Sequence, residues 1–242
     1  EYCDFVLQAA KDLMKKRKAE QTPDFSGELR KHLVKVPETI YLCRGMRIFG
    51  RRIKSIIFTT DLAIIRNSNA DAVLAVYPFT PQPVITHSLM LAADTPVFCG
   101  VGGGTTTGQR VVELSKHAEF QGAMGVVVNS PTENETIRAI KQAIDIPIVA
   151  TVVDESTDIE ARLAAGVSIL NVSAAARTPQ VVAHIRAQYP DVAILATGGP
   201  DDKSIRDTIE AGANSITWTP PSAANLFKGL MTKYRQGLPR ED

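Results

Sequence analysis

From residue 54 onward, short apolar runs rich in β-branched residues alternate with longer stretches in which apolar residues recur at helical spacing. Residues within each run are mostly apolar and do not alternate with polar ones, which indicates strands covered on both faces. The predicted strands are Ser55–Thr59, Ala72–Tyr77, Val97–Val101, Gly125–Asn129, Ile148–Val153, Ser168–Val172, Ala193–Ala196 and Ser215–Trp218.

The stretches between these runs predict helices. The predicted helices are Thr107–Phe120, Glu133–Ala143, Asp158–Ala165, Pro179–Gln188, Lys203–Ala211 and Ala223–Tyr234. Eight strand and helix units favour an α/β fold of the closed TIM (β/α)₈ barrel type. An open doubly wound sheet usually carries a glycine turn after its first strand, and here Thr59–Asp61 follows with no GxGxxG motif.

Residues 1–53 have a different pattern and form a predicted N-terminal extension, and residues 54–242 form the barrel. Tyr2–Ala19 is typical of a helix, and Thr39–Ile53 predicts a short hairpin or a strand, loop and strand. The hairpin segment carries four arginines, Arg44, Arg47, Arg51 and Arg52. We favour a lid over the bottom of the barrel or an oligomer arm, because charge runs are usually solvated faces; the alternative is an anion site.

The composition is that of a soluble globular protein. The 27 Lys and Arg residues nearly balance the 26 Asp and Glu residues, which argues against a nucleic-acid or membrane-surface partner. No apolar run is long enough to span a membrane, and no signal peptide is recognisable. Three cysteines without CxxC spacing (Cys3, Cys43 and Cys99) are typical of a reduced protein, so we expect a cytoplasmic location.

Barrels of this kind bind ligands at the C-terminal ends of their strands, which directs attention to the residues that follow each run. Thr197, Gly198 and Gly199 follow the seventh strand and precede a helix, and Ser222 precedes the helix after the eighth. Glycines let the backbone approach an anion, and helix N-termini supply N–H groups and positive dipole. We therefore predict a phosphate site here, although turn geometry alone could also require these residues.

A run of three glycines and three threonines follows the third strand. Gly102 and Gly103 could cradle a second anionic group with backbone N–H groups, or form a flexible lid or a necessary turn. No GK[ST] follows, so this is not a P-loop. Asn129 and Ser173, after the fourth and sixth strands, add polar groups to the same predicted mouth.

Three carboxylates at strand ends are candidates for acid and base chemistry: Asp61, Asp154 and Glu155. The stretch from Asp154 to Asp158 also resembles a helix start, so at least one of its carboxylates is expected to be a cap. There is no His or Cys cluster for zinc. The sequence predicts no resident cofactor or metal, although Mg²⁺ held by a carboxylate and a substrate phosphate is an open alternative.

Residues 122–225 resemble the 2-keto-3-deoxy-6-phosphogluconate (KDPG) aldolase group and related ribulose-phosphate-binding barrels. Ile148–Thr157 is similar to that group's fifth strand and helix start, Leu170–Ala175 to its sixth-strand motif, and Ala196–Pro200 to its phosphate-binding turn. The resemblance implies the barrel and the phosphate turn. It also implies a Schiff-base lysine at the position of Asn171, and Asn cannot form an imine.

These observations leave two hypotheses for function. The favoured one is an enzyme that acts on a small phosphorylated metabolite without Schiff-base chemistry, as a lyase, isomerase, epimerase or hydrolase. Asp61, Asp154 or Glu155 would then be the acid or base, and Asn171 would orient a substrate oxygen. The alternative is a regulatory barrel that binds a phosphorylated ligand without turnover. A homo-oligomer is also expected from the family likeness.

Overall fold

The computed structural model describes residues 8, 25, 27 and 33–237. Except for Gln8, the predicted helix Tyr2–Ala19 lies outside the described residues. The chain divides into two compact units, of which Leu33–Glu241 contains the barrel and the predicted hairpin. Everything below concerns this second unit.

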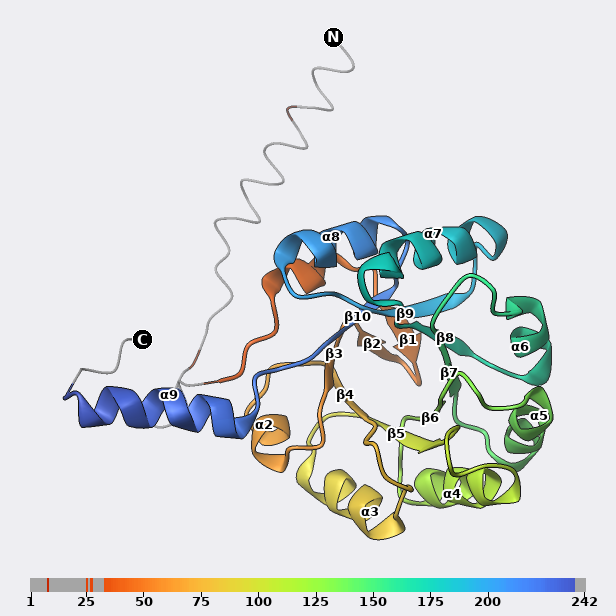
Figure 1. Ribbon diagram of the computed structural model, residues 1–242, viewed down its shortest axis with the longest axis horizontal. Coiled ribbons are helices and arrows are strands. Elements are labelled where there is room, and N and C mark those ends of the chain that lie inside the picture. Colours follow the sequence, from red (N-terminus) through yellow and green to blue (C-terminus); the bar gives the residue numbers. More distant parts are fainter. Residues whose placement is uncertain (1–7, 9–24, 26, 28–32, 238–242) are drawn as a thin grey trace. The chain divides into compact units, whose positions relative to one another are not determined.

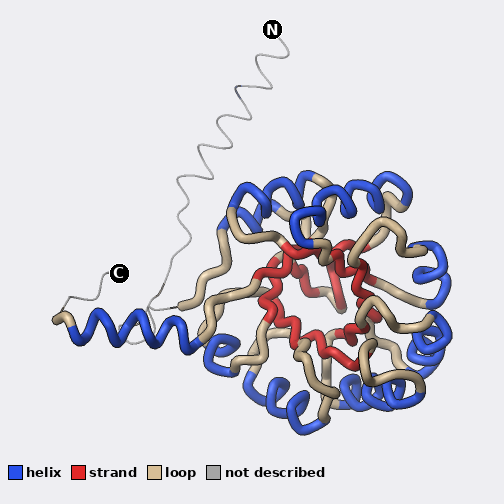
Figure 2. Tube along the Cα trace, viewed as in Figure 1, coloured by secondary structure: helices blue, strands red, loops and turns tan. Residues whose placement is uncertain are grey.

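Eight parallel strands close into a barrel in the order β10-β3-β4-β5-β6-β7-β8-β9, as Figures 1 and 2 show. The strands are β3 (Ser55–Phe58), β4 (Ala72–Ala75), β5 (Val97–Gly102), β6 (Gly125–Val128), β7 (Ile148–Val152), β8 (Ile169–Val172), β9 (Ala193–Thr197) and β10 (Ser215–Trp218). Each predicted run therefore forms a barrel strand, and the predicted TIM barrel is confirmed.

The helices surround this barrel and connect successive strands (Figure 2). They are α2 (Leu62–Arg66), α3 (Pro83–Ala92), α4 (Gln109–Phe120), α5 (Asn134–Ala143), α6 (Ile159–Ala165), α7 (Thr178–Gln188), α8 (Asp202–Glu210) and α9 (Ala223–Arg235). All six predicted helices form, and α2 and α3 were not predicted. The short α2 has too few residues to show a helical period, and α3 lacks a continuous polar face. In the described part of the chain, no helix is both long and apolar enough to cross a membrane.

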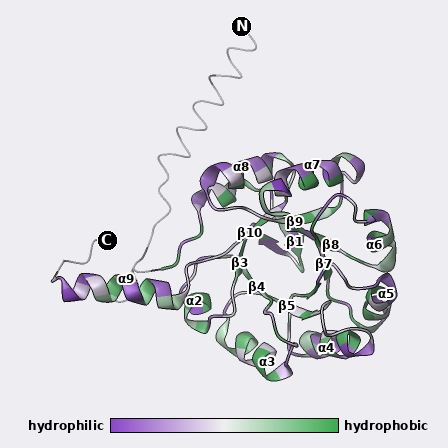
Figure 3. Ribbon diagram, in the orientation of Figure 1, coloured by the Kyte–Doolittle hydropathy of each residue, from purple (hydrophilic) through white to green (hydrophobic). Residues whose placement is uncertain are grey.

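Apolar side chains form two layers, one inside the barrel and one between the strands and the helices. The inner layer is centred on Phe98, which is buried together with Ile169 and Leu195. The outer helices carry both hydrophobic and hydrophilic residues, whereas the strands beneath them are mainly hydrophobic (Figure 3). Side chains alternate along a strand, so a residue two positions beyond a member of the inner layer also points into the barrel.

A hairpin closes the barrel at the end where the strands begin. It consists of β1 (Met46–Ile48) and β2 (Arg51–Ile53), and its buried Met46, Ile48 and Ile53 belong to the inner apolar layer. The Ser215 hydroxyl at the start of β10 donates a 2.7 Å hydrogen bond to the Ile53 carbonyl. The hairpin thus lies where a lid over the bottom of the barrel was expected, and the side chains of Arg47, Arg51 and Arg52 are exposed.

The last helix does not take the usual place of an eighth outer helix. None of the residues of α9 is buried. Val36 and Ile40, which precede the barrel, instead join the outer apolar layer with Ile57 and Ile216 of the neighbouring strands β3 and β10. The 3₁₀ helix η1 (Glu38–Leu42) also packs against α8. The chain before the barrel therefore covers the strands that α9 leaves uncovered.

The two described cysteines are structural. Burial raises the pKa of both the Cys43 and the Cys99 thiols to about 12. With a pKa of about 12, only roughly one thiol in ten thousand is ionised at pH 8. Both thiols should therefore react slowly, because the thiolate is the reacting form. In a Cys3→Ser variant, a thiol reagent should find almost no reactive group in the native protein and two after unfolding in denaturant. Rapid reaction of the native variant would show that these sites open easily.

Candidate functional site

The interior of the barrel becomes polar where the strands end. Ile169 and Leu195 are buried in the inner apolar layer, and two residues farther along the same strands lie Asn171 and Thr197. By the same alternation, Thr151 of β7 and Thr217 of β10 also point inward. Four adjacent strands thus place amide and hydroxyl groups at the C-terminal mouth, where this fold binds substrates.

Asn171 is buried, with 7% of its surface exposed. Its Nδ2 donates a long hydrogen bond of 3.4 Å to Thr151 Oγ1, and its Oδ1 has no partner. The hydroxyl of Thr217, which is 5% exposed, also lacks a partner. Unpaired buried polar atoms are costly, and these two at the mouth are available to hydrogen-bond to a bound molecule.

Ser173 and Thr197 form the rim above Asn171. The Thr197 hydroxyl donates a 3.3 Å hydrogen bond to Ser173 Oγ. Both hydroxyls retain capacity for a further bond, because a hydroxyl has one donor and two acceptor positions. The predicted residues Asn171, Ser173 and Thr197 are therefore brought together at one side of the mouth.

The glycines of the predicted phosphate turn have structural roles in the barrel. Gly198 N–H donates to the Thr217 carbonyl at 3.1 Å, and a Cβ on Gly198 would lie 2.6 Å from Ile216 Cγ2. Gly199 adopts a φ of 81°, which favours glycine. Packing and backbone conformation thus account for both glycines without a ligand.

The helix ends beside this turn are already capped. The Asp201 carboxylate accepts the Ser204 N–H at the start of α8, and these bonds hold the pKa of Asp201 below its ordinary value. The Ser222 hydroxyl accepts the Asn225 N–H at 3.2 Å at the start of α9. An ionised carboxylate at the α8 N-terminus competes with a phosphate for the same dipole. The phosphate site at Thr197–Gly199 and Ser222 therefore stays a prediction.

Two of the predicted acid and base residues are engaged elsewhere. The Asp61 carboxylate caps α2 by accepting the N–H groups of Ala63 and Ile64. The hydroxyl and the N–H of Ser156 both donate to the Asp154 carboxylate, which lowers its pKa and makes it a weaker base.

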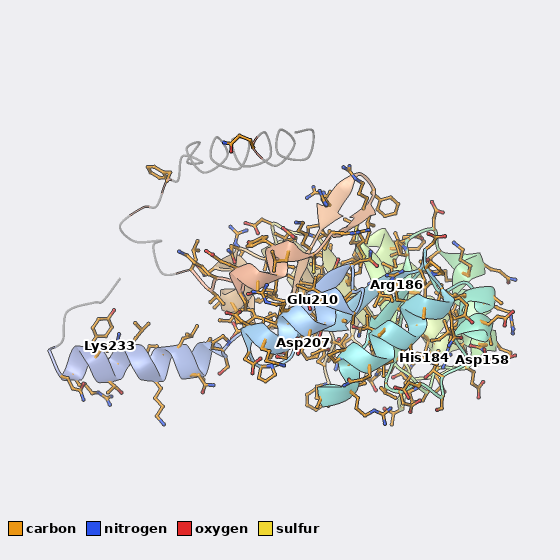
Figure 4. All side chains as sticks on the ribbon, turned by 90° about the horizontal axis from the view of Figure 1, so that it is seen from above. Asp158, His184, Arg186, Asp207, Glu210 and Lys233 are labelled. Carbon is orange, nitrogen blue, oxygen red and sulfur yellow. The ribbon has the colours of Figure 1, made fainter. Side chains whose placement is uncertain are left out.

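The Glu155 carboxylate is less constrained. It makes only a loose ion pair of 3.9 Å with Arg177. With Asp154 it lines a hollow between α6 and α7. Asp158 and His184, which Figure 4 labels, line the same hollow. Asp158 caps α6, which meets the expectation that one carboxylate of this stretch is a cap.

On the other side of the mouth lies a pocket of about 150 Å³ formed by the ends of β4, β5 and β6. Gly102 and Asn129 line it, and the Asn129 N–H donates to the Gly102 carbonyl at 3.0 Å. Tyr77 is the only residue lining this pocket that has a proton-transferring side chain, and its hydroxyl accepts the Gln82 N–H at 3.0 Å. A pocket of this volume has room for a small molecule only.

Gly103 does not line this pocket, although Gly102 and Gly104 do, and it packs against Thr132 instead. It adopts a φ of 103°, and a Cβ there would lie 2.3 Å from Thr132 Oγ1. The close contact requires glycine at this position.

Sequence reasoning missed Thr132, Thr151 and Thr217. Threonine is also an ordinary strand former, so its presence alone gives no signal. Counting alternate positions from Leu195 and Ser215 would have found the inward direction of Thr197 and Thr217.

The mouth lacks, among the described residues, the lysine that a Schiff base requires and the carboxylate cluster that a metal ion requires. Within residues 33–237, no lysine stands at the C-terminal end of a barrel strand. In the described part of the chain, no three His, Cys, Asp or Glu side chains lie close enough together to hold a metal ion.

Curated relatives match part of the chain. It is 37% identical over 157 residues to the 4-hydroxy-tetrahydrodipicolinate synthase of Rhodopseudomonas palustris (strain BisA53), covering 59% of this chain and 52% of that protein. It is 27% identical over 159 residues to the synthase of the same name from Methanococcoides burtonii, covering 60% of this chain and 54% of that protein. The chain spans about half the length of these relatives. No family model matches it.

Solved structures share the fold at low identity. The 2,3-dimethylmalate lyase of the PEP mutase/isocitrate lyase superfamily aligns with a TM-score of 0.59 and 15% identity, over 78% of this chain and 82% of that one. A phosphonopyruvate hydrolase in complex with oxalate and Mg²⁺ aligns with a TM-score of 0.57 and 11% identity, over 78% and 84%. A 4-hydroxy-tetrahydrodipicolinate synthase from Methylacidiphilum fumariolicum SolV aligns with a TM-score of 0.55 and 18% identity, over 76% and 73%. These likenesses show the TIM-barrel fold, and the specific resemblance to the KDPG aldolase group stays an expectation.

Proposed function

We propose that this barrel is an enzyme that acts on a small phosphorylated metabolite at its C-terminal mouth, as a lyase, isomerase or hydrolase without a Schiff base. The observation that carries the proposal is the buried carboxamide of Asn171, whose Oδ1 has no hydrogen-bond partner, together with the unpartnered hydroxyl of Thr217. Asn171 Oδ1 accepts a hydrogen bond and therefore suits a substrate hydroxyl, whereas the Thr217 hydroxyl can donate to a substrate oxygen on which negative charge develops.

The proposed roles follow from position. The Thr217 hydroxyl donates to the oxygen on which negative charge develops, and Asn171 Oδ1 accepts a hydrogen bond from a substrate hydroxyl. Thr151 holds the Asn171 amide in place. Thr197 and Ser173 bind the substrate at the rim. Tyr77 lines the mouth pocket and is the first candidate to transfer the proton. Glu155 is the second, and its exposed side chain would have to turn from the hollow between α6 and α7 toward the mouth.

The similar proteins support an acid substrate. Their names include a lyase, a hydrolase and synthases, and one structure contains oxalate and Mg²⁺. A resident Mg²⁺ does not fit the donor groups in the described part of the chain, since no cluster of carboxylates is present there. A Mg²⁺ that arrives with a phosphorylated substrate is compatible with the mouth, and no step is assigned to it.

A regulatory barrel that binds a phosphorylated ligand without turnover is the second candidate. One observation favours it: the carboxylates of Asp61 and Asp154 hydrogen-bond within their own loops and are poor bases in these positions.

A ligand screen on the full chain tests both candidates. We expect at least one sugar phosphate or phosphorylated oxo acid, with or without MgCl₂, to raise the melting temperature by roughly 5–10 °C at a hundredfold excess over its Kd. ³¹P NMR of the same mixtures then detects turnover, which Tyr77→Phe or Glu155→Gln should abolish. Binding without turnover supports the regulatory candidate, and no stabilisation by any phosphorylated compound contradicts both.

A further inference from the structure

A second pocket, of about 210 Å³, lies outside the mouth between the glycine-rich loop and the start of α5. Four threonines line it: Thr106, Thr107, Thr132 and Thr136. The loop from Gly102 to Thr107 is shared, because Gly102 and Gly104 line the mouth pocket and Thr106 lines both. The same short loop thus separates two polar sites.

Two helix N-termini meet at this pocket. Gly108, the N-cap of α4, and Glu133, the N-cap of α5, both line it, and neither helix has a side-chain cap. The first N–H groups of a helix have no partner within the helix and carry partial positive charge. Together with the hydroxyls they form a set of donors suited to an anion with several oxygens.

An independent observation also indicates a ligand here. Thr132 is 5% exposed and lines the pocket, and its hydroxyl has no hydrogen-bond partner. Only the missing side chain of Gly103 leaves room for that hydroxyl, as the 2.3 Å distance to an added Cβ shows. A buried hydroxyl kept open by a glycine is costly unless a bound group completes its bonding.

The guanidinium of Arg162 holds the loop between β6 and α5 in place. Arg162 of α6 donates to the carbonyls of Ser130 and Thr132 and, at 3.0 Å, to Asn134 Oδ1. Burial lowers the pKa of Arg162, but not enough to remove its positive charge at neutral pH. The Glu133 carboxylate also lines the pocket and opposes an anion, but it is exposed and able to turn toward solvent.

We infer that this pocket binds a phosphoryl group through the N-termini of α4 and α5 and the hydroxyls of Thr132, Thr106 and Thr107. The site accepts either inorganic phosphate or the phosphoryl end of a phosphate ester. Its existence does not depend on the proposed function. The glycine-rich loop borders both pockets, so the other end of a bound phosphate ester could enter the mouth pocket. This second step rests on the proposed function.

A titration of the full chain with inorganic phosphate tests the site, with sodium chloride at equal ionic strength as the reference. In ¹⁵N-labelled protein, the amide signals of Gly108–Arg110 and Asn134–Thr136 should shift with saturation. Thr132→Val should weaken phosphate binding about tenfold, the loss of one hydrogen bond to a charged group. Glu133→Gln should tighten it about two- to threefold, because one opposing charge is removed.

Two further variants keep the test decisive. Thr197→Val removes a hydroxyl from the rival turn after β9 and should leave the phosphate-dependent amide shifts at the starts of α4 and α5 unchanged. If Thr132→Val does not fold by circular dichroism, the exposed Thr107→Val takes its place. Loss of binding in Thr197→Val alone, or absence of saturable shifts at the two helix starts, would overturn the inference.

The source of the phosphoryl group is settled by comparing ligands. A titration with glycerol 3-phosphate that perturbs both the helix starts and the Asn129 amide supports an ester that reaches the mouth. Perturbation of the helix starts alone supports the phosphoryl site by itself. Turnover that survives Thr132→Val with unchanged KM would contradict a shared substrate while leaving the titration result for inorganic phosphate intact.

Discussion

Replacing Gly103 by alanine should destabilise the barrel by about 3 kcal/mol or more, which corresponds to a fall of roughly 6–12 °C in melting temperature. Gly103 has a φ of 103°, a backbone conformation that side chains rarely adopt. A Cβ there would also lie 2.7 Å from the Asn129 backbone nitrogen, which cannot move without breaking the bond to Gly102. Urea unfolding followed by circular dichroism measures the change.

The neighbouring glycine is a matched control. A Cβ on Gly104 would meet nothing within 4 Å, and this residue lacks the positive φ of Gly103. Gly104→Ala should therefore change the free energy of unfolding by no more than about 0.5 kcal/mol. Equal effects of the two substitutions would mean that the loop is not held in the described conformation.

The barrel itself could be predicted because its strands are encoded locally. Runs such as Gly125–Val128 are apolar throughout, which is what a strand buried on both faces requires. The place of α9 could not be predicted in this way. Its helical period is clear, but Val36 and Ile40 compete for the same surface of the barrel, and that competition is set by long-range packing.

The site was predicted less completely than the fold. Asn171 and Thr197 were found because the resemblance and the strand ends directed attention to them. Thr132 was missed because its significance comes from Gly103, which lies on a different loop. Asp61 and Asp154 stay candidates for acid and base chemistry. The sequence cannot rank them, because a carboxylate after a strand serves equally well as a helix cap or a turn residue.

Replacing Asn171 by leucine should abolish function while making the protein more stable. The unpaired Oδ1 of Asn171 costs about 1–3 kcal/mol in the free protein, and a leucine of similar size removes that cost. We expect a gain of about 1 kcal/mol, or roughly 2–4 °C in melting temperature. Turnover of the substrate found in the ligand screen should fall about a hundredfold, because leucine no longer accepts the hydrogen bond that positions the substrate.

Ser215→Ala is the control for Asn171→Leu, because it also removes a buried polar group from the barrel interior. Ser215 is fully buried at the opposite end of the barrel, and its hydroxyl is paired with the Ile53 carbonyl. Its replacement should destabilise the protein by about 1–2 kcal/mol and leave turnover unchanged, because a satisfied bond is lost far from the mouth. The two variants should thus change stability in opposite directions. Full turnover in Asn171→Leu, or destabilisation equal to that of Ser215→Ala, would show that the Asn171 amide is a structural group with no part in the site.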